Sequence, residues 1–125
     1  MPSRESFSGP LLAAVADSGI VGVRAGDEHR FTGVWVVVVR GRVFVRPWNA
    51  KSTGWHRAFA DEPNGAMQVG QRVIKVRAKR TRGERLYDEV DAAYAAKYST
   101  PASRKWVRGF ALPRRRATTT ELVPR

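Results

Sequence analysis

A run of six apolar residues, Val34 to Val39, followed at once by a glycine turn and a second apolar run, constrains the fold most strongly. The run contains only valine and tryptophan, which favour strands over helices. It is too short for a buried helix and far too short to cross a bilayer. Arg40-Gly41-Arg42 supplies a tight turn, and Val43 to Arg46 returns as the partner strand. The segment therefore predicts a β-hairpin whose first strand is buried on both faces.

A second hairpin is predicted further along the chain. Gly70-Gln71 separates a short run, Ala66 to Val69, from a longer one, Arg72 to Lys79. Apolar and basic residues alternate through the longer run, which is typical of a strand with one buried and one solvated face.

Helical patterns surround these hairpins. Pro10 to Asp17 and Trp55 to Asp61 predict short helices, and Ser8 is a candidate N-cap for the first. Glu84 to Tyr98 predicts a longer amphipathic helix, because apolar residues recur there every four positions. These positions are Leu86, Val90, Tyr94 and Tyr98. Further strands are expected at residues 20–24 and 117–123.

About six strands, two tight hairpins and interspersed helices predict an α+β chain built on an antiparallel barrel, and not a βαβ fold. The length of 125 residues predicts a single domain, 1–125, that buries roughly two-thirds of its unfolded surface. Residues 1–9 and 124–125 are expected to be flexible ends. Residues 103–116 are basic and lack a regular pattern, so we expect irregular structure there.

Several function classes are excluded by composition. The chain has no cysteine, so disulfides, thiolate metal sites and cysteine nucleophiles are absent. Its two histidines, His29 and His56, make a poor zinc site, and no metal is predicted. The polar segment from Met1 to Gly9 lacks the apolar stretch of a signal peptide. We therefore expect a soluble cytoplasmic protein with no membrane partner.

Positive charge is the strongest compositional signal. Lys and Arg outnumber Asp and Glu by 23 to 11. Five bases and no acid occur in residues 31–60, and six more bases without an acid occur in residues 72–82, whereas four acids gather in residues 84–91. Such a basic surface raises the local concentration of anions. A GC-rich genome, in which arginine codons are common, would also produce part of this excess.

The segment from Arg46 to Arg57 carries the most binding chemistry. A strand end with Arg46 leads into Lys51-Ser52-Thr53-Gly54 and then into the helix that begins at Trp55. Arginine, lysine, hydroxyl groups and helix amides all bind phosphate oxygens. The spacing is not that of a Walker A loop, however, and an ordinary polar connection with a helix-capping hydroxyl explains it equally well.

Three tryptophans lie in or beside the first hairpin. Trp35 is within the buried strand and is interpreted mainly as a core residue. Trp48 and Trp55 flank the basic loop, where their indoles either stack on a planar ring or cover the end of the barrel. The sequence leaves both alternatives open.

Conventional catalytic constellations are missing from the sequence. It contains no nucleophile elbow and no H-E-x-x-H motif. Glu84, Asp88 and Asp91 fall on the outward face of the predicted helix and are interpreted as solvated. His56 is a candidate proton donor, although a lone exposed histidine is usually incidental. No catalytic residue is assigned, and in an enzyme of this kind a bound cofactor would carry the chemistry.

The chain resembles an uncharacterised bacterial family of the split-barrel superfamily, which includes pyridoxamine phosphate oxidases and deazaflavin-dependent nitroreductases. The resemblance runs from about Leu11 to the end of the chain. It rests on residues Val34 to Val39, Gly41, Val43 to Arg46, Trp48, Lys51-Ser52, Gly54-Trp55, Arg57, Val90 to Tyr94, Lys97-Tyr98, Ala117 to Thr119 and Leu122 to Pro124.

The resemblance implies a six-stranded split barrel, often a homodimer, that holds FMN or a deazaflavin. It places the cofactor phosphate near Lys51 and Ser52. Asn49-Ala50 departs from the Gly-Arg turn of the deazaflavin enzymes, whereas the arginine excess suits the acidic tail of a deazaflavin. The predicted cofactor-binding residues are Arg46, Trp48, Lys51, Ser52, Thr53, Trp55 and Arg57.

Two functions of different class follow. One is an FMN- or deazaflavin-dependent oxidoreductase that passes hydride to a small-molecule acceptor. The other is a small basic barrel that binds nucleic acid, with phosphates on residues 72–82 and bases stacked on Trp48 or Trp55. The resemblance favours the first, and the acidic helix would repel a long polyanion. The sequence does not identify the acceptor, choose between the cofactors or establish turnover.

Overall fold

The first hairpin forms as the residue pattern predicts. The computed structural model describes residues 6–48 and 54–125. In it β2 (Thr32–Val39) pairs with β3 (Arg42–Val45), from Val36 opposite Val45 to Val39 opposite Arg42. Arg40 and Gly41 connect them with φ angles of 50° and 73°, the conformation of a two-residue turn whose twist matches the strands.

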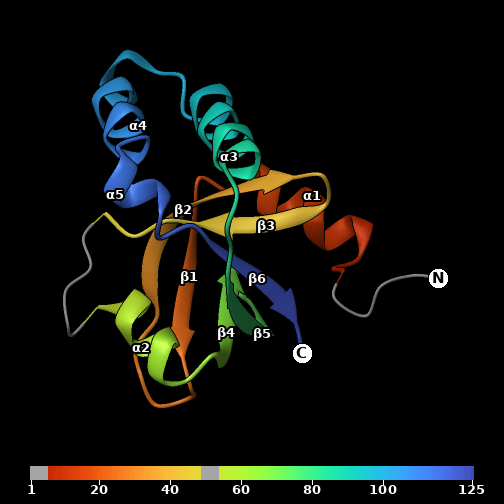
Figure 1. Cartoon of the computed structure of the whole chain (residues 1–125). Coiled ribbons are helices and arrows are strands. Elements are labelled where there is room, and N and C mark those ends of the chain that lie inside the picture. The colour runs from red at the N-terminus through yellow and green to blue at the C-terminus, as the bar shows by residue number, and fades with distance from the viewer. Residues whose placement is uncertain (1–5, 49–53) are drawn as a thin grey trace.

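Four more strands complete the sheet. They are β1 (Ile20–Ala25), β4 (Asn64–Val69), β5 (Arg72–Arg80) and β6 (Thr120–Pro124). Within the described residues the six strands close into a barrel in the order β1-β2-β3-β6-β5-β4, with every pair antiparallel (Figure 1). β4 and β5 form the predicted second hairpin. The structure confirms the predicted α+β class and the six-stranded antiparallel barrel of the split-barrel type.

Helices flank the barrel. They are α1 (Gly9–Asp17), α2 (Trp55–Asp61), α3 (Glu84–Lys97), a 3-10 helix (Pro101–Ser103), α4 (Arg104–Phe110) and α5 (Pro113–Arg116). Figure 1 shows α3, α4 and α5 grouped at one end of the molecule and α2 at the other. Ser8 caps α1 as predicted, accepting a hydrogen bond from the Leu11 amide. Among the described residues, no helix combines the length and the apolar character needed to span a bilayer.

β2 is buried on both faces, as its valine run predicts. Val36 is inside the barrel and fully buried, within a core that includes residues of every strand. Val37 and Val39 point outward and pack with Phe44 against Val90 and Tyr94 of α3. The predicted apolar stripe of α3 therefore covers the outer face of the first hairpin, and it fixes where this helix lies.

The expectation of irregular structure in residues 103–116 is wrong, because α4 and α5 lie there. Helices of seven and four residues are too short to show an apolar period. β6 also begins at Thr120, three residues later than expected. The hydroxyls of Thr118 and Thr119 donate to the carbonyls of Arg115 and Arg116, so these two threonines close α5 and do not extend the strand.

The described residues near both chain ends make tertiary contacts; residues 1–5 lie outside the described part of the chain, and the flexibility expected for residues 1–9 and 124–125 stays a prediction. Phe7 packs into the barrel core, and α1 already begins at Gly9. Pro124 is the last residue of β6, and the Arg125 guanidinium donates to the carbonyls of Gly65 and Val76. These contacts are tertiary, and neither segment has a periodic pattern that would have revealed them.

Candidate functional site

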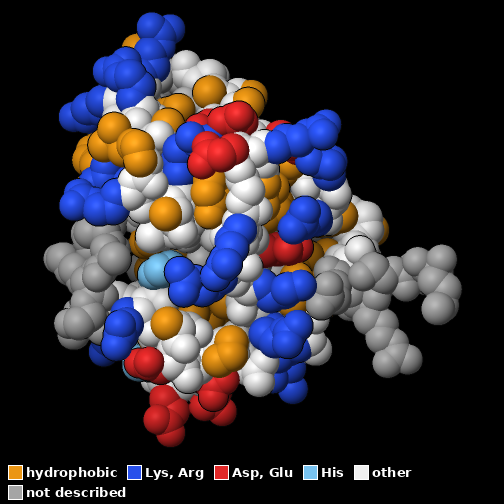
Figure 2. Space-filling model, viewed as in Figure 1, with side chains coloured by type: hydrophobic (Ala, Val, Ile, Leu, Met, Phe, Trp, Pro, Cys, Tyr) orange, Lys and Arg blue, Asp and Glu red, His pale blue; other side chains and the backbone are white. Residues whose placement is uncertain are grey.

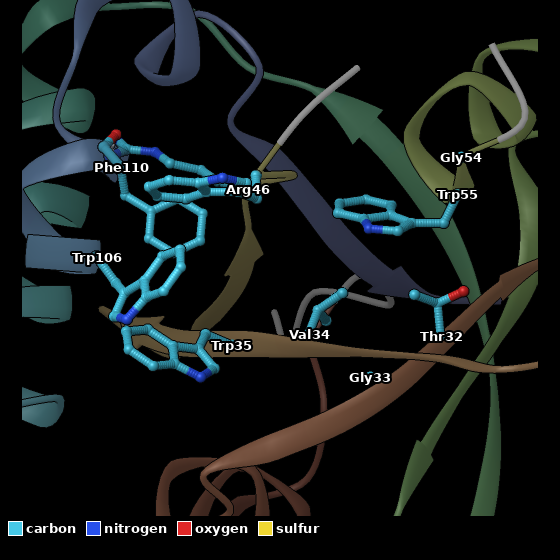
Figure 3. Close-up of a pocket in the computed structure, with 10 residues that line it drawn as sticks. Thr32, Gly33, Val34, Trp35, Arg46, Gly54, Trp55, Trp106 and Phe110 are labelled. Carbon is cyan, nitrogen blue, oxygen red and sulfur yellow. Dashed lines mark hydrogen bonds between the residues drawn. The ribbon is translucent and has the colours of Figure 1, made fainter. Parts of the chain in front are cut away.

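A cavity of about 500 Å³ opens beside β2, and all four tryptophans of the chain line it (Figure 3). They come from four segments: Trp35 from β2, Trp48 from the stretch after β3, Trp55 from α2 and Trp106 from α4. The other lining residues are Thr32, Gly33, Val34, Arg46, Gly54 and Phe110. The volume is within the range of small-molecule and cofactor sites, about 300–1,000 Å³.

The cavity exists because β2 extends beyond its partner. The β2–β3 ladder begins at Val36, so the preceding residues of β2 lie past the end of β3. The Tyr98 hydroxyl accepts from the Val36 amide and donates to the Gly19 carbonyl, which shows that the Val36 peptide groups face β1. Alternation along a strand then turns those of Gly33 and Trp35 to the opposite edge, where the cavity lies. β2 thus offers backbone donors and acceptors to a ligand.

The rings of Tyr94 and Tyr98 pack behind two aromatic side chains of the cavity wall, Phe110 and Trp35. Trp35 stacks on Tyr98 with centroids 4.0 Å apart and planes 3° from parallel. Phe110 stacks on Tyr94 at 5.0 Å, and the Tyr94 hydroxyl donates to the Trp35 carbonyl. Burial raises the pKa of both tyrosines, so each stays a neutral hydrogen-bond donor at physiological pH. The walls are therefore uncharged and fixed from behind.

Trp48 is held by residues of α4 and α5. Its ring meets Trp106 edge-on at 4.8 Å and Phe110 at 5.4 Å. The Arg115 guanidinium lies 3.7 Å from the centre of the Trp48 ring, and its Nε donates to the Trp48 carbonyl at 2.6 Å. A cation over an indole face is an attractive arrangement. Trp48 is thus positioned by contacts on two sides, although it is partly exposed.

Trp55 faces this aromatic group from α2. Figure 3 shows its indole on one side of the open space, with Trp35, Trp106 and Phe110 on the other. The Trp55 ring makes edge contacts with His56 and Phe59 on its own helix. The open space therefore lies between indoles that belong to opposite ends of the barrel.

Arg46, predicted to bind phosphate, lies in the cavity wall with its side chain fully buried. Its Nε donates to Thr119 Oγ1 at 2.8 Å, and its Nη1 donates to Asp91 Oδ1 at 2.5 Å and to the Phe110 carbonyl at 3.0 Å. Its Nη2 donates to the Tyr87 carbonyl at 3.2 Å. The guanidinium is thus engaged by the protein itself, and its predicted contact with phosphate stays a prediction.

The interpretation of Asp91 as a solvated carboxylate is wrong. Its side chain is 25% exposed, and it bridges Arg46 and the Nε of Arg116, which lies 3.1 Å from Asp91 Oδ2. Glu84 and Asp88, by contrast, are largely exposed, although both pair with Arg116. The helical pattern places all three carboxylates away from the apolar stripe. It does not show that the buried Arg46 pairs with Asp91, because that contact joins distant segments of the chain.

The predicted site residues separate into three groups. Arg46, Trp48 and Trp55 line the tryptophan cavity. Arg57 does not, and it lines a different cavity together with His56. Lys51, Ser52 and Thr53 lie outside the described residues.

Several lining residues were missed by sequence reasoning. Trp106 and Phe110 are four residues apart and so share one face of α4, but a single pair of this spacing is too little to predict a helix. Thr32 and Gly33 begin β2 two residues before the Val34 to Val39 run, and that run does not show that they lie beyond the end of β3. Trp35 combines the predicted packing role with an exposure to the cavity.

Comparison with known proteins places the chain in a sequence family. Residues 14–122 match the sequence profile of a family described as an uncharacterized protein conserved in bacteria (DUF2255). No curated protein matches the chain.

Two solved structures share the fold. One is the conserved hypothetical protein Rv2991 from Mycobacterium tuberculosis, with a TM-score of 0.62 and 11% identity over 98% of this chain and 82% of that one. The other is a heme binding protein from Mycobacterium smegmatis, with a TM-score of 0.51 and 15% identity over 100% of this chain and 52% of that one. The chain thus spans about half of the latter protein. At these identities the likeness concerns the fold alone.

Replacing Asp91 with alanine is expected to lower the free energy of unfolding by about 3 kcal/mol, because it leaves the Arg46 charge buried without its counter-ion. Glu89→Ala on the same helix is the matched control. Glu89 pairs with the exposed Arg40, so its loss should cost less than about 1 kcal/mol. Urea denaturation of both variants checks this, and equal losses would contradict the role given to Asp91.

Replacing Gly109 with alanine is expected to displace Trp48. A Cβ at position 109 would lie 2.4 Å from Trp48 Cη2, so the ring must move. The overpacking should cost about 1–3 kcal/mol, despite the higher helix propensity of alanine. Near-ultraviolet circular dichroism reports the ring movement. Gly9→Ala, where a Cβ meets open space, should leave the spectrum unchanged, and an unchanged spectrum for Gly109→Ala would refute the contact.

Proposed function

The chain belongs to the bacterial DUF2255 family, and we propose that its barrel binds the planar ring of a redox cofactor, FMN or a deazaflavin, between its four tryptophans. The observation that carries this proposal is the convergence of every indole of the chain on one cavity of about 500 Å³. Tryptophans are costly to expose, and four of them from separate segments meet around an open space. Their flat faces suit a conjugated ring.

The polar groups of the cavity suit the edge of such a ring. The peptide groups of Gly33 lie beyond the end of β3 and line the cavity, whereas the Trp35 carbonyl already accepts a hydrogen bond from the Tyr94 hydroxyl. The pyrimidine half of a flavin or deazaflavin carries alternating C=O and N–H groups, which backbone groups of this kind bind. The residues fit the ring, with indole faces for its surface and the β2 edge for its rim.

Arg46 is a polar part of the cavity wall. Among the described lining residues it is the one charged side chain, and it is buried. Because its guanidinium is paired with the Asp91 carboxylate, it contributes a polar group to the wall and not an uncompensated charge. When bound, a flavin or deazaflavin ring supplies hydride-transfer chemistry. The chain's own residues would hold the ring and exclude water from its faces. The function proposed on this basis is that of an oxidoreductase that acts on a small acceptor.

A ring without a metal fits the cavity better than heme does. The similar barrel from Mycobacterium smegmatis is described as heme binding, which is consistent with a planar ligand for this fold. The described lining residues of the present cavity, however, include no histidine, methionine, cysteine or tyrosine. Those are the residues that commonly ligate heme iron.

The arrangement also favours a small ring over a nucleic acid strand. Stacking platforms for single strands are open grooves in which aromatic and basic residues alternate. Here the indoles face one another around a cavity. The outward positions of β5 carry Val73, Lys75, Arg77 and Lys79, with no aromatic residue among them.

Titration with FMN and with oxidised deazaflavin tests the proposal through intrinsic fluorescence. Because every tryptophan lines the cavity, a bound ring should quench most of the emission, with saturation in the micromolar range. No saturable quenching by either ligand would contradict it. Tight binding of a single-stranded oligonucleotide that weakens steeply with salt would favour the nucleic-acid alternative instead.

Trp106→Ala should weaken the binding of that ring roughly tenfold, because an aromatic contact contributes about 0.5–1.5 kcal/mol beyond its buried area. Trp106 is partly exposed on α4, so its truncation spares the barrel core. Val73→Ala removes an exposed apolar side chain of β5 far from the lining set and should leave the dissociation constant unchanged. Equal affinity for the two variants would exclude Trp106 from the site.

A further inference from the structure

A second cavity, of about 300 Å³, lies against another face of α2 and shares no lining residue with the tryptophan cavity. Three elements form it: α2, β5 and β6. Its lining residues are His56, Arg57, Phe59, Ala60, Ala78, Lys79, Arg80 and Thr120. Consecutive residues of α2, Trp55 and His56, thus line different cavities.

The lining of the second cavity is basic. Arg57 comes from the helix, and Lys79 and Arg80 come from the facing strand. Because Lys79 and Arg80 are consecutive, their side chains leave opposite faces of β5, and the site depends on Arg57 and Arg80. No carboxylate belongs to the described lining. The neighbouring acid on β6, Glu121, is bound by the Arg42 guanidinium through both of its oxygens. Like charges gathered around one hollow create a positive potential that attracts an anion.

The imidazole of His56 is close enough to Arg80 for the positive charge to affect its pKa. The pKa of His56 is lowered, first because the ring is half-buried and second because of the charge on Arg80. The other charged groups of the cavity, Arg57 and Lys79, are also cationic, and β6 contributes only Thr120 to the described lining. The imidazole is therefore predominantly neutral at physiological pH, and it becomes easier to protonate when a negative charge enters.

We propose that this second cavity binds the phosphate group of a small phosphate monoester. Guanidinium groups form paired hydrogen bonds with phosphate oxygens, and the Arg57 and Arg80 side chains approach from different elements. Phe59 and Ala78 add an apolar wall, and a wall of low dielectric strengthens the attraction between the charges. The volume exceeds that of a bare phosphate, and so it accommodates part of the esterified group as well.

Figure 2 shows the surroundings of this cavity. Lys and Arg side chains are spread over the face between α2 and the strands, and a histidine lies beside them. Acidic side chains are fewer on this face, and they lie at its top, at its bottom near α2 and in one place among the basic side chains. Basic side chains therefore outnumber acidic ones on this face.

The titration of His56, followed by nuclear magnetic resonance of the imidazole protons, tests the proposal without any enzymatic readout. Inorganic phosphate and glycerol phosphate are the probes, with chloride as the reference anion. Binding should raise the pKa of His56, because the phosphate stabilises the protonated ring. His29, outside the cavity lining, serves as the internal control, and the chemical shifts of its imidazole protons should not respond to phosphate. A His56 pKa that phosphate does not change would overturn the proposal.

Two variants locate the binding. Arg57→Ala and Arg80→Ala should each weaken phosphate binding about tenfold, because each removes a charged hydrogen-bond donor from the phosphate. Both side chains are exposed, so their truncation leaves the core intact. Arg72→Ala removes the same charge from the far end of β5 and should leave the affinity unchanged. An equal loss in Arg72→Ala would show attraction by net charge alone and would refute a built site.

The source of the phosphate is distinguished by comparing FMN with riboflavin. A cofactor phosphate in this cavity predicts that FMN raises the pKa of His56, that riboflavin does not, and that inorganic phosphate competes with FMN. An independent phosphorylated ligand predicts that inorganic phosphate shifts His56 equally with the ring bound. Failure of the proposed function shows as missing tryptophan quenching, whereas failure of the phosphate site shows as an unresponsive His56.

Discussion

The bonding of the buried Arg46 guanidinium holds the candidate site together. A charge without access to water must be paired and hydrogen-bonded inside the protein. Arg46 meets this condition through the Asp91 carboxylate, the Thr119 hydroxyl and the carbonyls of Tyr87 and Phe110. One side chain at the end of β3 thereby joins α3, the end of α4 and the residues that lead into β6. These segments carry or support most of the aromatic wall, so the shape of the cavity depends on this set of bonds.

The difference in length between β2 and β3 creates the cavity at the side of the packed barrel. β2 has eight residues and β3 has four, so half of β2 lies beyond the ladder that the two strands share. The uncovered edge faces a space that side chains of other segments surround but do not fill. Trp35 and Trp48, whose rings contact residues of α4, close it on one side, and Trp55 closes it from α2. The fold thus presents indole faces and a free backbone edge to the same ligand.

Local patterns were sufficient to predict the barrel but not the site. Valine runs, glycine turns and the four-residue apolar period in residues 84–98 depend on neighbours in sequence, and these predictions were confirmed. The burial of Arg46, its pairing with Asp91 and the arrival of Trp106 depend on contacts between distant segments, which one sequence does not show. Arg57 was grouped with the loop before it, yet it lies about half a helical turn after Trp55 and lines another cavity. A short helix such as α4 carries too few residues for a periodic signal.

The central claim is that all four tryptophans surround one ligand, and their indole N–H signals in a nitrogen–proton correlation spectrum test it most directly. The chain has four tryptophans and therefore four such signals. Addition of FMN or deazaflavin should move all four with a single dissociation constant, because one ring contacts the whole cavity. Signals that stay in place, or that move with different dissociation constants, would contradict a common site.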